Sequence, residues 1–155
     1  NTLIMSYILW LDDKRHPFDC FRSTNDPTII KVEINDNLYG RERDDTITLR
    51  WRGKKVVWVK NYIEFISALV THGKPLHVCF DHDLLESHYT PEKYWGDYAA
   101  SKKFQYERGF EFGTGLDCAK ALVYRYYGEL PTTSIHSANP IGAERISGYL
   151  HRSRN

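Results

Sequence analysis

Short apolar runs without polar alternation constrain the fold of this chain most. The sequences YILWL (7–11), KKVVWV (54–59) and LHVCF (76–80) gather apolar residues where a half-exposed strand would alternate. Such runs are typical of strands buried on both faces, as in a parallel sheet that is covered on both sides. A fourth, short strand is predicted over TTSIHS (132–137). We therefore expect a parallel sheet built on these four strands.

Helical spacing follows three of these strands, over residues 61–73, 115–128 and 139–152. The first helix is predicted to begin after Asn61, a good N-cap residue, and to stop at Gly73. Its predicted buried face consists of Ile63, Ile66, Leu69 and Val70. The last helix has Pro140 near its first turn, where the missing N–H is harmless. Alternating strands and helices imply right-handed βαβ units and an α/β fold.

Two insertions interrupt the single domain that we expect over residues 6–152. Residues 18–54 contain TIIKVEIN and TITLRWRGKKVVWV, which favour a β-hairpin or other extended structure with a turn near RG. Residues 84–114 form a long connection that is rich in aromatic residues and lacks clear periodicity. A connection of this length in a small domain is usually functional or disordered.

Charge and cysteine content exclude several classes of protein. The net charge is +1, with 21 basic and 20 acidic residues, which argues against bulk binding of duplex DNA but is compatible with a local basic patch. The three cysteines are far apart and form no CxxC motif, so a disulfide framework or structural zinc site is not expected, and a reducing cytoplasm fits. No apolar stretch reaches the 18 residues or so of a membrane span.

Polar residues follow three of the predicted strands at the point where each strand ends. These are Asp12-Asp13, Asp81-His82-Asp83, and His136-Ser137 with Asn139. Ligands of parallel α/β sheets bind beyond the carboxyl ends of the strands, so we expect these groups to converge at one edge. Clustered carboxylate oxygens suit Mg²⁺ or another hard divalent cation, which keeps several waters and meets phosphate oxygens.

The motifs LWLDDKRHP, FDHDL, TG and HSANPIGAERI, in this order, resemble those of the cyclic-phosphate-processing receiver-like domains. The resemblance implies a receiver-like (flavodoxin-like) three-layer sandwich with a mostly parallel sheet, in which the fifth strand is missing or replaced. It also implies the processing of cyclic phosphates in RNA repair or nucleotide signalling. Such domains occur in bacteria and phages, so a cytoplasmic protein from that setting is implied as well.

Compared with ordinary receivers, Asp12 and Asp13 match the acidic pair and Asp81 matches the phosphoacceptor. Ser137 is the counterpart of the hydroxyl residue after the fourth strand. The lysine after the fifth strand is not evident, which argues against a phosphorelay role. His82, Asp83 and His136 are additions that a relay site does not need and that suggest acid–base chemistry.

We assign hypothetical roles on this basis. A divalent cation is held by Asp12, Asp13 and Asp81. His82 and His136 exchange protons with water and with the leaving ribose oxygen, and Asp83 orients an imidazole or joins the metal shell. The substrate-binding candidates are Arg15, Ser137, Asn139, Gly142, Tyr94 and Trp95. The N–H groups of Ile141, Gly142 and Ala143 are expected to be free for an anion at the start of the last helix.

Other interpretations stay open at the level of sequence. The substrate of an enzyme would be a cyclic nucleotide or cyclic-phosphate-ended RNA, but the chain could instead be a nucleotide-sequestering protein or a signalling module phosphorylated on Asp81. Ser137 and Asn139 could serve only as the cap of the last helix. His136 could be a satisfied core histidine, and His82 could simply bind a backbone group. A metal-free mechanism and a homodimer are both compatible with the sequence.

Overall fold

A four-stranded parallel sheet forms the centre of the computed structural model, which describes residues 7–36, 41–48, 54–84, 93, 97–107, 113–137 and 139–154. Its strands are β1 (Tyr7–Leu11), β5 (Lys55–Val59), β6 (His77–Phe80) and β7 (Thr132–Ile135). They lie in the order β5-β1-β6-β7, and every neighbouring pair is parallel. The four predicted strands are confirmed in the doubly wound order, and no fifth parallel strand follows β7 in the described part of the chain.

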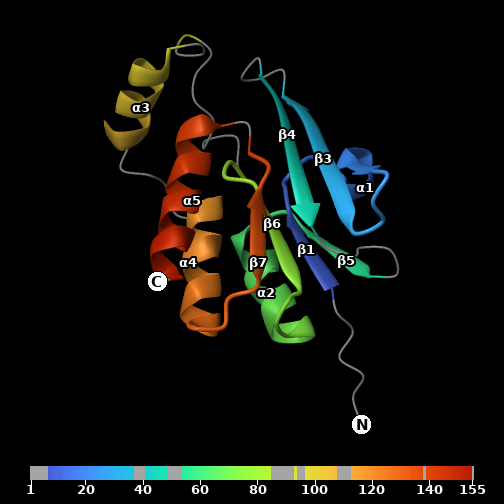
Figure 1. Cartoon of the computed structure of the whole chain (residues 1–155). Coiled ribbons are helices and arrows are strands. Elements are labelled where there is room, and N and C mark those ends of the chain that lie inside the picture. The colour runs from blue at the N-terminus through green and yellow to red at the C-terminus, as the bar shows by residue number, and fades with distance from the viewer. Residues whose placement is uncertain are drawn as a thin grey trace.

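Three helices cover one face of this sheet: α2 (Tyr62–His72), α4 (Gly115–Tyr126) and α5 (Pro140–Ser153) (Figure 1). Alternate residues of β1, Tyr7, Leu9 and Leu11, point toward them because successive side chains of a strand lie on opposite faces. There they join one core with Phe65 of α2 and with Leu122 of α4. Burial of this apolar surface is the main favourable contribution to the stability of the fold.

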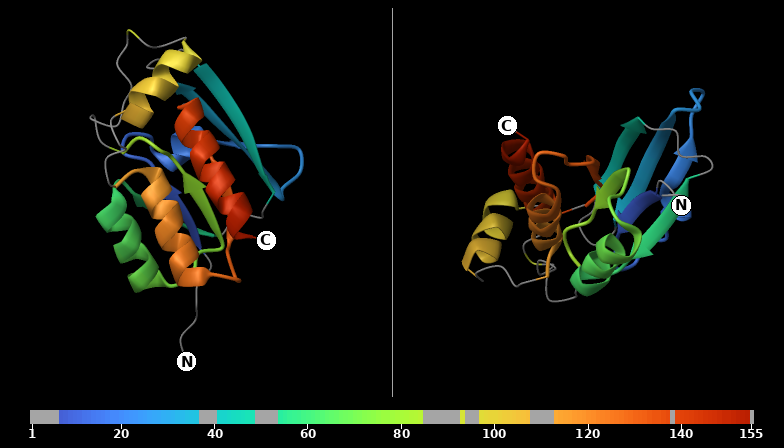
Figure 2. Two further views of the ribbon diagram at one scale, coloured as in Figure 1. Left: turned by 90° about the vertical axis from the view of Figure 1, so that its left-hand side faces the viewer. Right: turned by 90° about the horizontal axis from the view of Figure 1, so that it is seen from below.

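The opposite face of the sheet is covered by the first insertion (Figure 2). It contains α1 (Pro17–Cys20) and an antiparallel sheet of β2 (Phe21–Ser23), β3 (Ile29–Asp36) and β4 (Arg41–Thr48). Ile30, Val32 and Ile34 of β3 pack against Ile8 and Trp10 of β1. The predicted three-layer sandwich with a hairpin insertion is thus confirmed, and its third layer is this antiparallel sheet. The predicted turn near RG (52–53) lies outside the described residues.

The predicted buried face of α2 is partly wrong. Ile63 and Val70 are 79% and 62% exposed, whereas Phe65 and Leu69 are buried. The buried stripe is centred on Phe65, whose ring lies 5.9 Å from that of Phe80. The helix ends agree with prediction, since Asn61 caps it by accepting the Glu64 N–H at 2.8 Å.

A helix that the sequence did not predict lies in the second insertion. This is α3 (Tyr98–Glu107), which begins after Asp97 accepts the Ala100 N–H at 3.0 Å. Its apolar residues show no strong helical stripe, so periodicity gave no signal. The described helices include none that is long and apolar enough to span a membrane.

Candidate functional site

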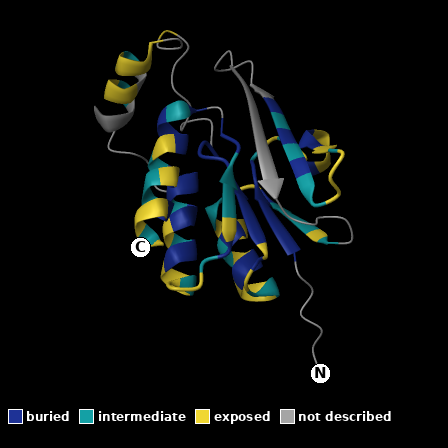
Figure 3. Cartoon of the chain, in the orientation of Figure 1, coloured by how far each residue is buried: buried dark blue, intermediate teal, exposed yellow. Residues whose placement is uncertain are grey.

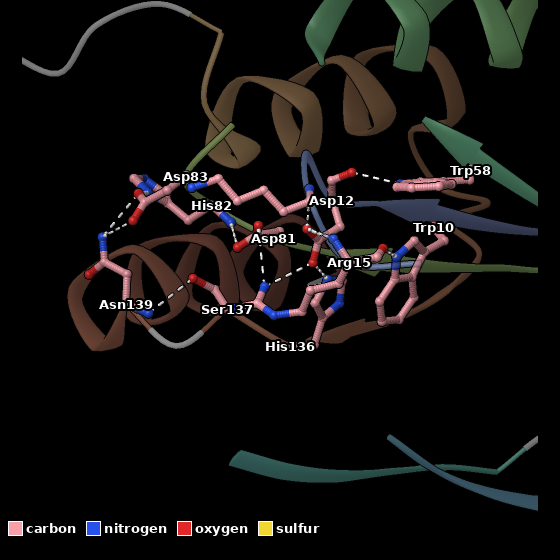
Figure 4. Close-up of polar contacts among 11 residues, drawn as sticks. Trp10, Asp12, Arg15, Trp58, Asp81, His82, Asp83, His136, Ser137 and Asn139 are labelled. Carbon is pink, nitrogen blue, oxygen red and sulfur yellow. Dashed lines mark hydrogen bonds and ion pairs between the residues drawn. The ribbon is translucent and has the colours of Figure 1, made fainter. Parts of the chain in front are cut away.

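The ends of three strands meet at one edge of the central sheet, as the sequence predicts. The backbone ladder continues one residue beyond each strand: the Asp81 N–H donates to the Leu11 carbonyl at 3.0 Å, and the His136 N–H donates to the Phe80 carbonyl at 2.9 Å. This pairing fixes the residues that follow β1, β6 and β7 side by side. Asp12, Asp81 and His136, which are far apart in the sequence, therefore lie in one cluster (Figure 4).

Asp12 is the most heavily engaged residue of the cluster. Its Oδ1 accepts the backbone N–H groups of Lys14 and Arg15 at 2.9 and 2.8 Å. Its Oδ2 accepts from Arg15 Nη1 at 2.9 Å and pairs with His136 Nε2 at 3.1 Å. Burial alone would raise the Asp12 pKa, but His136 and Arg15 outweigh it and hold the pKa at about 2. Asp12 is thus a carboxylate at neutral pH, and the His136 Nε2 carries the proton between them.

Asp81 has the opposite electrostatic environment. Burial raises its pKa well above the ordinary value, and the neighbouring charge of Asp12 adds to this, while Arg15 opposes it. Its Oδ1 accepts the His82 N–H at 2.8 Å, and its Oδ2 lies 3.8 Å from Arg15 Nη1. The charged form of Asp81 is favoured by any further positive charge that enters the cluster.

The carboxylates of Asp12, Asp13 and Asp81 offer oxygens that all lie within 4.8 Å of one another. Three carboxylate oxygens so placed match the ligands that Mg²⁺ prefers, so these residues fit a hard divalent cation. The Arg15 guanidinium contacts two of the same carboxylates. Arg15 therefore braces the acidic cluster, and a cation would compete with it for Asp12 and Asp81.

A second histidine–carboxylate pair lies beside this cluster. His82 Nδ1 and Asp83 Oδ1 are 2.7 Å apart, and the Asn139 side-chain amide donates to the same oxygen at 3.2 Å. The His82 Nε2 is buried and has no hydrogen-bond partner among the residues that the structure describes. The ring packs on Gly142, where a Cβ would lie 2.3 Å from His82 Cγ. Asp83 orients His82 from one side, and the absent side chain of Gly142 makes room for the ring.

The expectation of free N–H groups at the start of α5 is wrong. The Asn139 side-chain oxygen accepts the N–H groups of Ile141 and Gly142, both at 3.1 Å. The Asn139 carbonyl accepts the Ala143 N–H at 2.9 Å. Asn139 is the N-cap, and Ser137 Oγ in turn accepts the Asn139 N–H at 3.2 Å. Within this structure both residues serve the cap, because an N-cap satisfies the donors that a helix leaves open.

Two tryptophans that were not predicted from the sequence support the cluster. Trp10 stacks on the His136 ring, with 3.9 Å between centroids and 3° between planes, and its Nε1 donates to the Arg15 carbonyl at 2.8 Å. Trp58 Nε1 donates to the Asp12 carbonyl at 2.7 Å. A buried indole needs a partner for its N–H, so tryptophans in strands that end at the site were a usable signal.

Gly115 closes the site from the side of α4. Its N–H donates to the His82 carbonyl at 2.8 Å, and a Cβ at this position would lie 1.8 Å from the Asp81 carbonyl oxygen. The TG motif thus has a physical reason, since only glycine allows the backbone of α4 to approach β6 so closely.

Most polar groups of the site are shielded from solvent, and in Figure 3 the strands β1 and β6 that lead to them have the colour of buried residues. None of the following is more than 4% exposed: Asp12, Asp81, His82, Asp83, His136, Ser137 and Asn139. Asp13 and the Arg15 side chain, which is 22% exposed, are partly accessible. Tyr94 and Trp95 lie outside the described residues. The arrangement could hold a cation and it orients two imidazoles within a largely buried site, where charges interact strongly.

Comparison with known proteins agrees with this geometry. The family model for the cyclic-phosphate processing receiver domain matches residues 7–152, which includes every strand-end residue of the site. The searches of the curated proteins and of the solved structures each found no match. The chain belongs to the family of cyclic-phosphate processing receiver domains.

Proposed function

We propose that this protein hydrolyses a cyclic phosphate, either a 2′,3′-cyclic RNA end or a cyclic nucleotide. In this reaction the oxygen of water forms a bond to phosphorus and one phosphorus–ribose oxygen bond breaks. The water gives up a proton, and the leaving ribose oxygen takes one. The observation that carries the proposal is the pair of histidine–carboxylate contacts: His82 with Asp83 beside the acidic cluster, and His136 with Asp12 within it.

His82 is proposed as the residue that exchanges a proton with the reacting groups. Its Nδ1 is committed to Asp83, which leaves Nε2 as the atom that takes or gives the proton. An imidazole nitrogen can act as a general base or a general acid. Because Nε2 is buried, a substrate reaches it only if the site opens.

Asp12, Asp13 and Asp81 are proposed to hold a divalent cation such as Mg²⁺. When bound, it would supply Lewis-acid polarisation of a phosphoryl oxygen and a lower pKa for a coordinated water. Arg15 is the partly accessible cation of the site, and we assign its guanidinium to a phosphate oxygen, for which its planar donors are suited. His136 holds Asp12 in its ionised form and orients it.

The proposal is tested by incubating the protein with cyclic mononucleotides, cyclic oligonucleotides and RNA that ends in a 2′,3′-cyclic phosphate. Parallel reactions contain Mg²⁺ or EDTA, and the products are read by mass spectrometry. We expect at least one substrate to gain the mass of a water molecule in the presence of Mg²⁺. Recovery of every ligand unchanged would contradict hydrolysis, and stable binding without conversion would indicate a sequestering protein instead.

The histidine roles are tested separately with His82→Gln and His136→Gln. Loss of the proton-exchanging ring in His82→Gln should lower the rate by about 10²- to 10⁴-fold, and His136→Gln should also lower it because Asp12 loses the partner that keeps it ionised. His151→Gln is a matched control, because His151 is exposed near the far end of α5. A turnover equal to wild type in both site variants would remove the two imidazoles from the mechanism.

A further inference from the structure

A basic cavity of about 410 Å³ lies between α3, α4 and α5 and is not used by the proposed chemistry. Positive side chains reach it from all three helices: Lys102 of α3, Lys120 of α4, and Arg145 and Arg152 of α5. The acidic residue that lines it is Glu144, whose carboxylate accepts the Tyr98 hydroxyl. The whole chain has a net charge of only +1, so the four cations concentrate positive charge at this one place.

Two residues that line the cavity are sequence neighbours of glycines that pack on the strand-end site. These are Leu116 and Ile141, in the first turns of α4 and α5. Leu116 follows Gly115, which packs on the Asp81 carbonyl, and Ile141 precedes Gly142, which packs on the His82 ring. From Ile141 to Arg152 the helix rises about 16 Å at 1.5 Å per residue. Arg145 and Arg152 therefore follow Ile141 along α5, in the direction away from the site.

Aromatic rings accompany these cations. Tyr149 lines the cavity, and Lys120 Nζ lies 5.9 Å from the centre of its ring. Tyr98, which is 48% exposed, has Lys102 Nζ at 5.8 Å from its ring. Cations that follow a phosphate backbone, together with aromatic faces on which bases stack, are the usual elements of single-strand recognition. A site for an acidic peptide would not need the rings.

We propose that this cavity binds the single-stranded RNA chain that precedes a 2′,3′-cyclic phosphate end, with its phosphates on Lys120 and Arg152. The inference rests on the proposed function and narrows its substrate class, since only an RNA end carries both the cyclic phosphate and a chain that leads away from it. A free cyclic mononucleotide has no such chain and would not need the cavity.

The test is the binding of a fluorescein-labelled oligoribonucleotide that ends in a linear 3′-phosphate, measured by fluorescence anisotropy at several salt concentrations. This probe needs no turnover. The double variant Lys120→Gln/Arg152→Gln changes two exposed residues, so its fold should persist. We expect at least about a tenfold loss of affinity and a log–log salt slope that is shallower by about 1.4, from about 0.7 for each lost phosphate contact.

The matched control is Lys74→Gln/Arg125→Gln, which removes one exposed lysine and one exposed arginine away from the cavity. Equal affinity and salt slope in the cavity variant and in this control would overturn the inference. An equal loss of binding to poly-glutamate would also overturn it, because it would indicate a general anion surface. If cavity-dependent RNA binding persists while no cyclic phosphate is opened, the proposed function fails and the proposal that the cavity binds RNA stands. If the cyclic phosphate of mononucleotides is opened but RNA affinity is unchanged in the cavity variant, only the proposal that the cavity binds RNA fails.

Discussion

Gly142→Ala tests the packing of His82 on α5 most sharply. A Cβ at this position would lie 2.3 Å from His82 Cγ and 2.6 Å from Nδ1, well inside van der Waals contact. The ring cannot turn away cheaply, because Nδ1 is bound to Asp83 at 2.7 Å and the ring is 2% exposed. Displacing it would also leave a buried carboxylate without that partner.

The expected loss of stability follows from two opposing effects. Alanine is favoured over glycine in a helix interior by up to about 1 kcal/mol, and less in a first turn. Overpacking of a buried site costs about 1–3 kcal/mol, and loss of the His82–Asp83 contact adds about 1–3 kcal/mol. We therefore expect Gly142→Ala to lower the free energy of unfolding by roughly 3 kcal/mol.

Gly148→Ala, six residues further along α5, is the matched control. A Cβ there meets only the end of the Arg152 side chain at 3.0 Å, which is free to shift. This variant should gain about 0.5–1 kcal/mol from helix propensity. Urea unfolding followed by circular dichroism measures both variants against the wild type. If Gly142→Ala is as stable as Gly148→Ala, the close packing of His82 against α5 is refuted.

Three further predictions concern separate parts of the structure. Burial lowers the pKa of His77 from 6.5 to about 4, so between these pH values the folded protein keeps the ring neutral while the unfolded chain binds a proton. Because of this residue, the free energy of unfolding should fall by about 3 kcal/mol as the pH is lowered from about 7 to about 4. In urea unfolding, the loss that His77→Gln shows over the same pH range should be smaller by that amount. Arg15→Gln should tighten Mg²⁺ binding at least about tenfold, because the guanidinium no longer competes for the carboxylates of Asp12 and Asp81. Isothermal titration calorimetry measures this affinity, and unchanged or weaker binding would contradict a cation at this cluster. Phe65→Ala should lower the free energy of unfolding by about 3–5 kcal/mol because Phe65 is buried, and Ile63→Ala should lower it by less than about 0.5 kcal/mol because Ile63 is exposed. If urea unfolding gave the two variants similar free energies of unfolding, the assigned buried face of α2 would be wrong.

The sheet and the strand-end cluster were predictable because their signals are local. Runs such as YILWL place apolar residues on both faces of a strand, so both faces must be covered. Residues that follow parallel strands meet at one edge of the sheet regardless of the structure of the intervening chain. This is why Asp12, Asp81 and His136 could be grouped from sequence, although 124 residues separate Asp12 from His136.

Other features depend on tertiary contacts that a single sequence does not encode locally. Ile63 and Val70 are apolar but exposed, whereas Phe65 of the same helix is buried and its ring lies 5.9 Å from that of Phe80. The N–H groups at the start of α5 were expected to be free, yet the Asn139 cap engages them. The cap and an anion use the same donors, so the residue types alone do not distinguish the two arrangements.

The measurement that tests the central claim most directly is the rate of 2′,3′-cyclic phosphate opening by Asp12→Asn, followed by ³¹P NMR. The substitution keeps the shape of the side chain but removes the charge that pairs with His136 and Arg15. We predict that the wild-type protein opens the cyclic phosphate and that the variant, shown to be folded by circular dichroism, does so more slowly by more than about 10²-fold. A folded variant with the wild-type rate would contradict the strand-end cluster as the site of the chemistry.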